Sequence, residues 1–164
     1  LDYPVALKRL WHASIGVGYD SQFVRLVPAV IDEYILAADR KGRVAAYATE
    51  SGKRLWETRT RVPVSAGPGA GDGLVLLGTS DARVLALSLE DGEPLWEASV
   101  SSEVLSVPQI DRGVVVVQSV DGNDGDGRIG PPHQPKRQGG RSCWIFEVVA
   151  RVEQFSRRIH TVAD

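Results

Sequence analysis

The residues with the clearest potential for chemistry form a run of aspartates and glycines, Asp121-Gly-Asn-Asp-Gly-Asp-Gly127. An EF-hand calcium loop needs oxygen ligands at positions 1, 3 and 5, glycine at position 6 and glutamate at position 12. With Asp121 as position 1, positions 5, 6 and 12 are occupied by Gly125, Asp126 and Pro132. Three required residues are missing, so the run is interpreted as a solvated turn and not as a metal site.

The other candidate groups lack the neighbours that their chemistry requires. The glycine-rich stretch 67–73 has no Gly-Lys-Ser/Thr, which a phosphate-binding loop needs. No Gly-x-Ser-x-Gly elbow surrounds the serines that were considered as nucleophiles, Ser14, Ser65 and Ser106. The histidines are far apart and in unrelated contexts: His12, His133 and His160. Cys143 is the only cysteine. We therefore expect no catalytic residue, no cofactor and no metal site.

Composition excludes further classes of function. The 164 residues carry a formal net charge of −2, which gives no basic field for nucleic-acid binding. No apolar run approaches the roughly 20 residues of a membrane-spanning helix. The chain contains no methionine, so we expect it to begin inside a longer gene product or to be processed. A signal peptide or lipid anchor would then lie upstream of Leu1.

A period of 40 residues organises the first three quarters of the chain. The segment 43–56, RVAAYATESGKRLW, recurs at 83–96 as RVLALSLEDGEPLW. The shared landmarks are a glycine and a tryptophan, Gly52 with Trp56 and Gly92 with Trp96. A second landmark has the same spacing: Pro28, Pro68 and Pro108. Leu10-Trp11 is interpreted as an earlier copy of the Leu-Trp pair. A fixed period of this length indicates a repeat architecture.

Each period contains about four short apolar segments separated by Gly, Asp, Ser and Pro turns, which is the spacing of a β-propeller blade. The sequence therefore predicts an all-β, partial propeller of about three four-stranded blades. The predicted blade anchors are Trp11, Trp56 and Trp96, with Gly52 and Gly92 in the turns. A β-sandwich has no internal 40-residue identity, and a leucine-rich repeat has a shorter period. Because three blades cannot close a ring, we expect exposed edges and poor stability of the isolated chain.

The repeat ends abruptly after Gly122. Asp124 stands where Val44 and Val84 predict a valine, and Lys136 stands where a tryptophan is expected. We therefore divide the chain into a propeller part, 1–122, and an irregular linker and tail, 123–164. Apolar residues at spacings of three and four favour a short helix near 142–159, with a strand over 144–149 as the alternative. A native, different ending and a shift of reading frame both explain the break, and its abruptness favours the shift.

The repeat copies AAYATESGKRLWET and LALSLEDGEPLWEA resemble the A-x-D-x-x-T-G-x-x-x-W repeat of pyrroloquinoline-quinone-type propellers, although Ala48 and Ser88 replace the usual aspartate. The phrases AADRKGRV and SEVLSVP are most similar to the N-terminal part of the BamB family of lipoproteins. The resemblance covers roughly 10–122. It implies an eight-bladed parent and a non-catalytic scaffold that assists assembly of outer-membrane β-barrel proteins. It also implies contacts with BamA-like periplasmic domains, and a place at the periplasmic face of a Gram-negative outer membrane.

Two other functions remain open on this repeat: a fragment of a quinone-dependent dehydrogenase, and a generic propeller interaction or sensor module. The dehydrogenase would need a metal-binding carboxylate cluster and usually a vicinal disulfide, whereas Cys143 stands alone. Loops at the faces of a propeller commonly bind other proteins. The candidate partner-binding residues are Arg40, Lys41, Arg59, Arg61, Ser102 and Glu103. Ordinary polar turns are the competing interpretation of the same residues.

Overall fold

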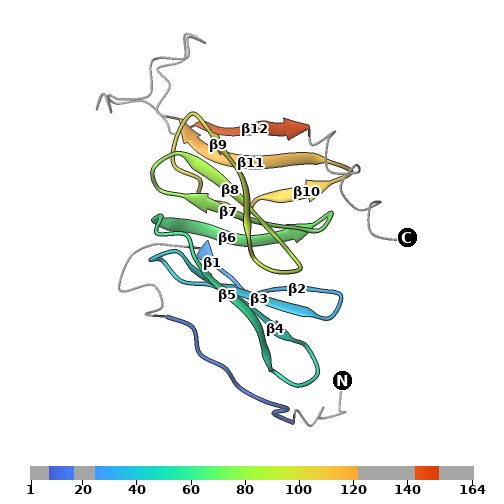
Figure 1. Cartoon of the computed structure of the whole chain (residues 1–164). Coiled ribbons are helices and arrows are strands. Elements are labelled where there is room, and N and C mark those ends of the chain that lie inside the picture. The colour runs from blue at the N-terminus through green and yellow to red at the C-terminus, as the bar shows by residue number, and fades with distance from the viewer. Residues whose placement is uncertain (1–7, 17–24, 122–142, 152–164) are drawn as a thin grey trace, which may run out of the picture.

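The computed structural model describes residues 8–16, 25–121 and 143–151, and every regular element among them is a β-strand. Three sheets lie one on another (Figure 1). No described residue belongs to a helix that is long and apolar enough to cross a membrane.

The first sheet, called blade 1, has the strand order β2-β3-β4-β5 and is antiparallel throughout. Its strands are β2 (Ala29–Ile31), β3 (Tyr34–Ala38), β4 (Arg43–Ala48) and β5 (Arg54–Arg59). Blade 2 repeats this meander with β6 (Val64–Gly71), β7 (Leu74–Thr79), β8 (Arg83–Ser88) and β9 (Pro94–Ser99). The short strand β1 (Arg25–Leu26) adds to β6 in parallel. Consecutive strands joined by short turns pair with each other, as expected for a meander.

Blade 3 contains β10 (Gln109–Asp111), β11 (Val114–Asp121) and β12 (Cys143–Arg151), in that order. The helix expected near 142–159 is not what residues 143–151 form, because they pair antiparallel with β11 from Val114↔Arg151 to Asp121↔Cys143. The strand was the alternative for this segment. Residues 143–151 read CWIFEVVAR, rich in aromatic and β-branched residues, and the edge of β11 offers backbone N–H and C=O groups with which an added strand can pair.

The 40-residue period appears directly in the backbone. The turn before the second strand of each blade holds a non-glycine residue with positive φ: Asp32 at 48°, Asp72 at 50° and Arg112 at 48°. The turn after the third strand of blades 1 and 2 holds Gly52 at 68° and Gly92 at 75°. The same turn geometry therefore recurs at the same offset, and the expected partial propeller of about three blades is confirmed.

Two apolar cores join the three blades. The first core lies between blades 1 and 2 and includes Leu36, Val44, Val75 and Leu77. The second lies between blades 2 and 3 and includes Leu76, Val84, Val104 and Val115. Alternate residues of β7 contribute to opposite cores, so all six of its residues are buried. This explains why Leu74 to Leu77 is a continuous apolar run and not an alternating one.

Candidate functional site: docking tryptophans and two loop faces

Trp56 joins blade 1 to blade 2 through a turn of the neighbouring sheet. Its indole Nε1 donates a hydrogen bond of 2.9 Å to the carbonyl oxygen of Leu89. The ring also lies over Gly92, where an added Cβ would come within 2.4 Å of Trp56 Cε3. Two constraints require glycine at position 92. Its φ of 75° is unfavourable for residues with a side chain, and the Trp56 ring leaves no room for a Cβ.

Trp11 repeats this arrangement against blade 1. Its Nε1 donates to the carbonyl oxygen of Thr49 at 2.9 Å, and a Cβ at Gly52 would lie 2.4 Å from Trp11 Cδ2. The Trp11 ring also stacks on Tyr47, with ring centroids 6.4 Å apart. Residues 8–16 therefore contact blade 1 as β5 contacts blade 2.

Trp96 is at the equivalent position of β9, but its environment differs. Its Nε1 is buried and has no hydrogen-bond acceptor in the described part of the chain. The residues one period beyond Leu89 and Gly92 are Ile129 and Pro132, which lie outside the described ranges. Two of the three predicted anchors therefore make the same turn contact, and the turn equivalent for Trp96 lies outside the described ranges.

Connections between strands alternate between the two ends of the sheets. We call one end the first loop face. It carries the connections 39–42, 60–63, 80–82 and 100–108. Backbone hydrogen bonds link these connections in series: Val64 N to Arg40 O at 3.1 Å, Ser80 N to Pro63 O at 3.0 Å and Val104 N to Thr79 O at 3.2 Å. The face is therefore one continuous row of braced loops.

All six candidate partner-binding residues lie on or beside this face. Arg40 is half-buried and Lys41 exposed in the first connection, while Arg59 and Arg61 are exposed at the end of β5 and in the next connection. Ser102 and Glu103 are half-buried in the connection from β9 to β10. The structure therefore separates the four cations, at blade 1, from Ser102 and Glu103, at the junction with blade 3.

Several neighbouring arginines are already paired. Glu57 binds Arg43 at 3.5 Å and Arg54 at 2.5 Å, and Arg83 contacts Asp81 and also Glu97 at 2.9 Å. The Arg83 guanidinium holds the pKa of Asp81 below its usual value, with help from the Thr79 hydroxyl and against partial desolvation. Burial alone raises the pKa of Glu103.

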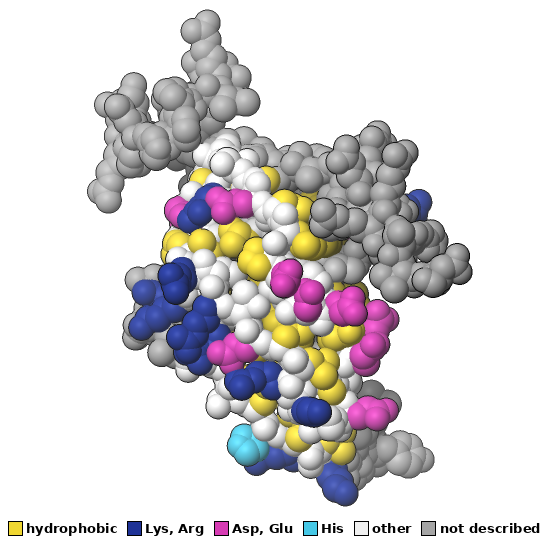
Figure 2. Space-filling view, viewed as in Figure 1, with side chains coloured by type: hydrophobic (Ala, Val, Ile, Leu, Met, Phe, Trp, Pro, Cys, Tyr) yellow, Lys and Arg dark blue, Asp and Glu magenta, His cyan; other side chains and the backbone are white. Residues whose placement is uncertain are grey.

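The second loop face is at the opposite end and is strongly acidic. Its connections are 32–33, 49–53, 72–73, 89–93 and 112–113. Seven carboxylates lie in them: Asp32, Glu33, Glu50, Asp72, Glu90, Asp91 and Glu93. Lys53 and Arg112 are the cations of the same connections. In Figure 2 the largest cluster of Lys and Arg lies on the left and most Asp and Glu lie on the right, although some Asp and Glu also lie on the left. The sequence signal for this face is the excess of Asp and Glu in every second connection along the chain, which we did not use.

The residues with metal-binding chemistry do not converge within the described ranges, where no group of three His, Cys, Asp or Glu could hold an ion. The run 121–127 lies outside those ranges except for Asp121. Of the candidate serines, Ser65 is buried and donates from Oγ to the carbonyl oxygen of Val104 at 2.6 Å. That bond braces the junction between blades 2 and 3.

Comparison with known proteins shows which family this chain resembles. A family model described as outer membrane protein assembly factor BamB matches residues 8–129. Among curated relatives, BamB of Alkalilimnicola ehrlichii is 51% identical over 67 residues, covering 41% of this chain and 18% of the relative. BamB of Pseudomonas aeruginosa is 44% identical over 75 residues, covering 46% and 20%. The chain spans about a fifth of the length of these relatives.

Solved structures agree with the fold. The crystal structure of BamB from Moraxella catarrhalis matches with a TM-score of 0.51 and 26% identity, over 56% of this chain and 28% of that one. Quinohemoprotein alcohol dehydrogenase from Comamonas testosteroni matches with a TM-score of 0.50 and 21% identity, over 58% and 17%. The second likeness shows the fold alone. With the family model covering 8–129 of 164 residues, the chain belongs to the family of outer membrane protein assembly factor BamB.

Proposed function

We propose that this chain is part of a non-catalytic scaffold in the assembly of outer-membrane β-barrel proteins, at the periplasmic face of a Gram-negative outer membrane. The observation that carries the proposal is the first loop face. It is a row of connections held by backbone hydrogen bonds between blades, and it presents exposed charged side chains at fixed positions. Scaffolding requires such a rigid surface and no reactive group.

The partner proposed is a BamA-like periplasmic domain, bound by the first loop face. The candidate contacts are Arg40, Lys41, Arg59 and Arg61 on blade 1 and Ser102 with Glu103 near blade 3. Trp11, Trp56 and Trp96, with Gly52 and Gly92, are assigned the structural role of fixing blade to blade. Separating anchors from contacts makes the proposal testable, because surface substitutions should change binding without unfolding the blades.

The test is co-purification of the intact 164-residue chain with the tagged periplasmic domains of a BamA-like protein from the same bacterium. We expect retention of the chain at moderate salt, and competition by a longer BamB from that organism. Absence of retention, with a folded chain by circular dichroism, would contradict the proposal. Stoichiometric binding of pyrroloquinoline quinone with Ca²⁺, accompanied by dehydrogenase activity, would replace it by the enzyme alternative.

A further inference from the structure

We propose that Arg40, Lys41, Arg59 and Arg61 form a docking site for an acidic segment of a partner polypeptide. These four residues are called the cationic patch. The proposal rests on the scaffold function above, since it names the chemistry of a partner for part of the same loop face. It excludes Ser102 and Glu103 from the site.

Backbone contacts bring the two connections of the cationic patch together. The carbonyl oxygen of Gly42 accepts hydrogen bonds from Thr60 N at 2.8 Å and from Thr60 Oγ1 at 3.0 Å. Val64 N donates to the carbonyl oxygen of Arg40. An added Cβ at Gly42 would lie 2.8 Å from the carbonyl oxygen of Val62, so the two loops meet backbone to backbone. The four cations are therefore presented by a single braced unit.

The charge of the patch is not balanced by ion pairs within the described ranges. Neighbouring Arg43, Arg54 and Arg83 each contact a carboxylate, whereas none of the four patch residues does so there. Asp39 lies under the turn, 2% exposed, and its Oδ1 accepts the backbone N–H groups of Lys41 and Arg43, each at 2.9 Å. That carboxylate therefore supports the loop from within, and its Oδ2 lies against Gly16, where an added Cβ would come within 1.7 Å.

The register of blade 1 places two arginines opposite each other on neighbouring strands. Arg59 lies directly opposite Arg43 across β4 and β5, and like charges in such a pair repel. Glu57 offsets the charge of Arg43, at 3.5 Å, but it also binds Arg54. A carboxylate placed beside Arg59 would relieve this repulsion.

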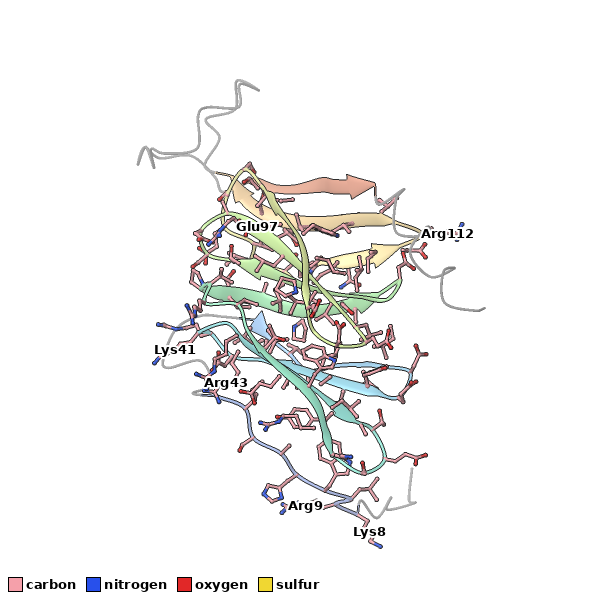
Figure 3. The ribbon with its side chains drawn as sticks, viewed as in Figure 1. Lys8, Arg9, Lys41, Arg43, Glu97 and Arg112 are labelled. Atoms are coloured by element: carbon pink, nitrogen blue, oxygen red, sulfur yellow. The ribbon has the colours of Figure 1, made fainter. Side chains whose placement is uncertain are left out.

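Blade 2 shows that the fold does not need these charges. One period on, the four positions hold Ser80, Asp81, Ser99 and Ser101. The turn is still closed there, with the Thr79 hydroxyl accepting Arg83 N at 2.9 Å in the place of Asp39. Figure 3 places Lys41 and Arg43 at the same end of the sheets as Glu97, which binds Arg83 of blade 2. The cations are therefore a property of the blade 1 surface and not of the turn.

The size of the patch favours a narrow polypeptide over an extended polyanion. Three of the four residues are arginines, whose planar guanidinium matches a carboxylate with two parallel hydrogen bonds. A flat anionic membrane or a nucleic acid would also cover Asp81 and Glu103 on the same face, and would be repelled by them. A loop or strand with a few carboxylates fits blade 1 alone.

The test uses a fluorescein-labelled oligoglutamate peptide and the intact chain, followed by fluorescence anisotropy. Removing two patch charges, K41Q with R61Q, should raise the dissociation constant about fivefold at about 0.1 M salt. The matched control is K53Q with R112Q on the second loop face. Arg61 and Arg112 both have positive φ, at 59° and 48°, so backbone strain is the same in both variants. The control should bind the peptide as the wild type does.

If both variants bound the peptide equally weakly, or if neither bound it more weakly than the wild type, the cationic patch would not be the docking site. Thermal melts of both variants should coincide with the wild type, which keeps loss of folding from imitating loss of binding. Vesicles of anionic phospholipid and a DNA duplex are tested with the same variants, and patch-dependent binding to either without binding to the peptide would overturn the acidic polypeptide as partner. Retention on BamA-like domains that is unchanged by K41Q with R61Q would leave the scaffold function standing and remove this inference.

Discussion

Trp56 and Trp96 are 40 residues apart and lie at the same position of consecutive blades, yet their indole N–H groups have different environments. Trp56 donates to Leu89 and covers Gly92, whereas Trp96 has a buried Nε1 without an acceptor among the described residues. A typical hydrogen bond contributes about 1 kcal/mol net, while a buried group without a partner costs about 1–3 kcal/mol. The comparison separates two contributions: Trp56 combines packing with a hydrogen bond to the neighbouring turn, whereas among the described residues Trp96 shows packing against the second core alone.

The largest effect should come from removing the docked ring. Trp56→Ala deletes the packing against blade 2 as well as the hydrogen bond to Leu89, and should lower the free energy of unfolding by about 3 kcal/mol. Trp96→Ala should cost less, because it removes a donor that has no acceptor among the described residues. Urea unfolding followed by circular dichroism measures both. Equal costs would break the comparison between the two tryptophans.

The glycine under the ring gives the next largest effect, and the chain supplies a control. Gly92 and Gly73 have nearly equal φ angles, 75° and 73°, so alanine at either position should cost about 1 kcal/mol in backbone strain. A Cβ added at Gly92 would lie 2.4 Å from the Trp56 ring. A Cβ added at Gly73 would have no non-neighbouring heavy atom of the described residues within 4 Å. Gly92→Ala should therefore lower the free energy of unfolding by about 1–3 kcal/mol more than Gly73→Ala.

The urea midpoints of Gly92→Ala and Gly73→Ala test whether the Trp56 ring is packed tightly on Gly92. Indistinguishable midpoints would mean that the ring moves aside at little cost in free energy. A lower midpoint for Gly92→Ala would show that the contact between the ring and Gly92 is tight.

The fold was predictable from the sequence because its signal is repeated. A 40-residue period with Gly, Trp and Pro landmarks fixes the strand spacing, and each landmark has a backbone counterpart, such as the positive φ of Asp32, Asp72 and Arg112. The candidate loop residues were predicted to lie in loops at the faces of the propeller, and the strand order shows that they share one face. What local pattern did not reveal was the acidic second face, which depends on which turns share an end of the sheets.

The segment 143–151 shows where local pattern fails for a physical reason. Trp144 and Val148 have helical spacing, yet the chain there is strand β12, because β11 offers an unpaired edge. Tertiary pairing overrides a short periodic signal.

A milder substitution isolates the hydrogen bond from the packing. Trp56→Phe keeps an aromatic ring over Gly92 but removes the donor to Leu89, leaving that carbonyl without its partner. It should cost about 1 kcal/mol more than Trp96→Phe, which removes a donor that has no acceptor among the described residues. Midpoints of urea unfolding for the two phenylalanine variants provide the measurement. A larger cost for Trp96→Phe would show that Trp96 is the better-satisfied anchor.

The smallest effect is a pH dependence of opposite sign at two carboxyl groups of the first loop face, Asp81 and Glu103. The Arg83 guanidinium lowers the pKa of Asp81 in the folded chain, so this carboxylate stabilises the fold above its unfolded pKa of about 3.9. That contribution is lost as pH falls through the folded pKa. Because the Asp81 side chain is 43% exposed, solvent screening keeps the contribution small. Glu103 has the opposite sign, since burial raises its pKa and its contribution is lost as pH rises through the folded value.

Replacing each acid by its amide separates these two contributions. Asp81→Asn should destabilise the chain at neutral pH, and its difference from the wild type should shrink as the solution becomes acidic. Glu103→Gln should be neutral to slightly stabilising at neutral pH, because it removes a carboxylate that pays for burial when charged. Melts of both variants from pH 3 to 7 measure the two contributions, and the same sign of pH dependence at both positions would contradict this assignment.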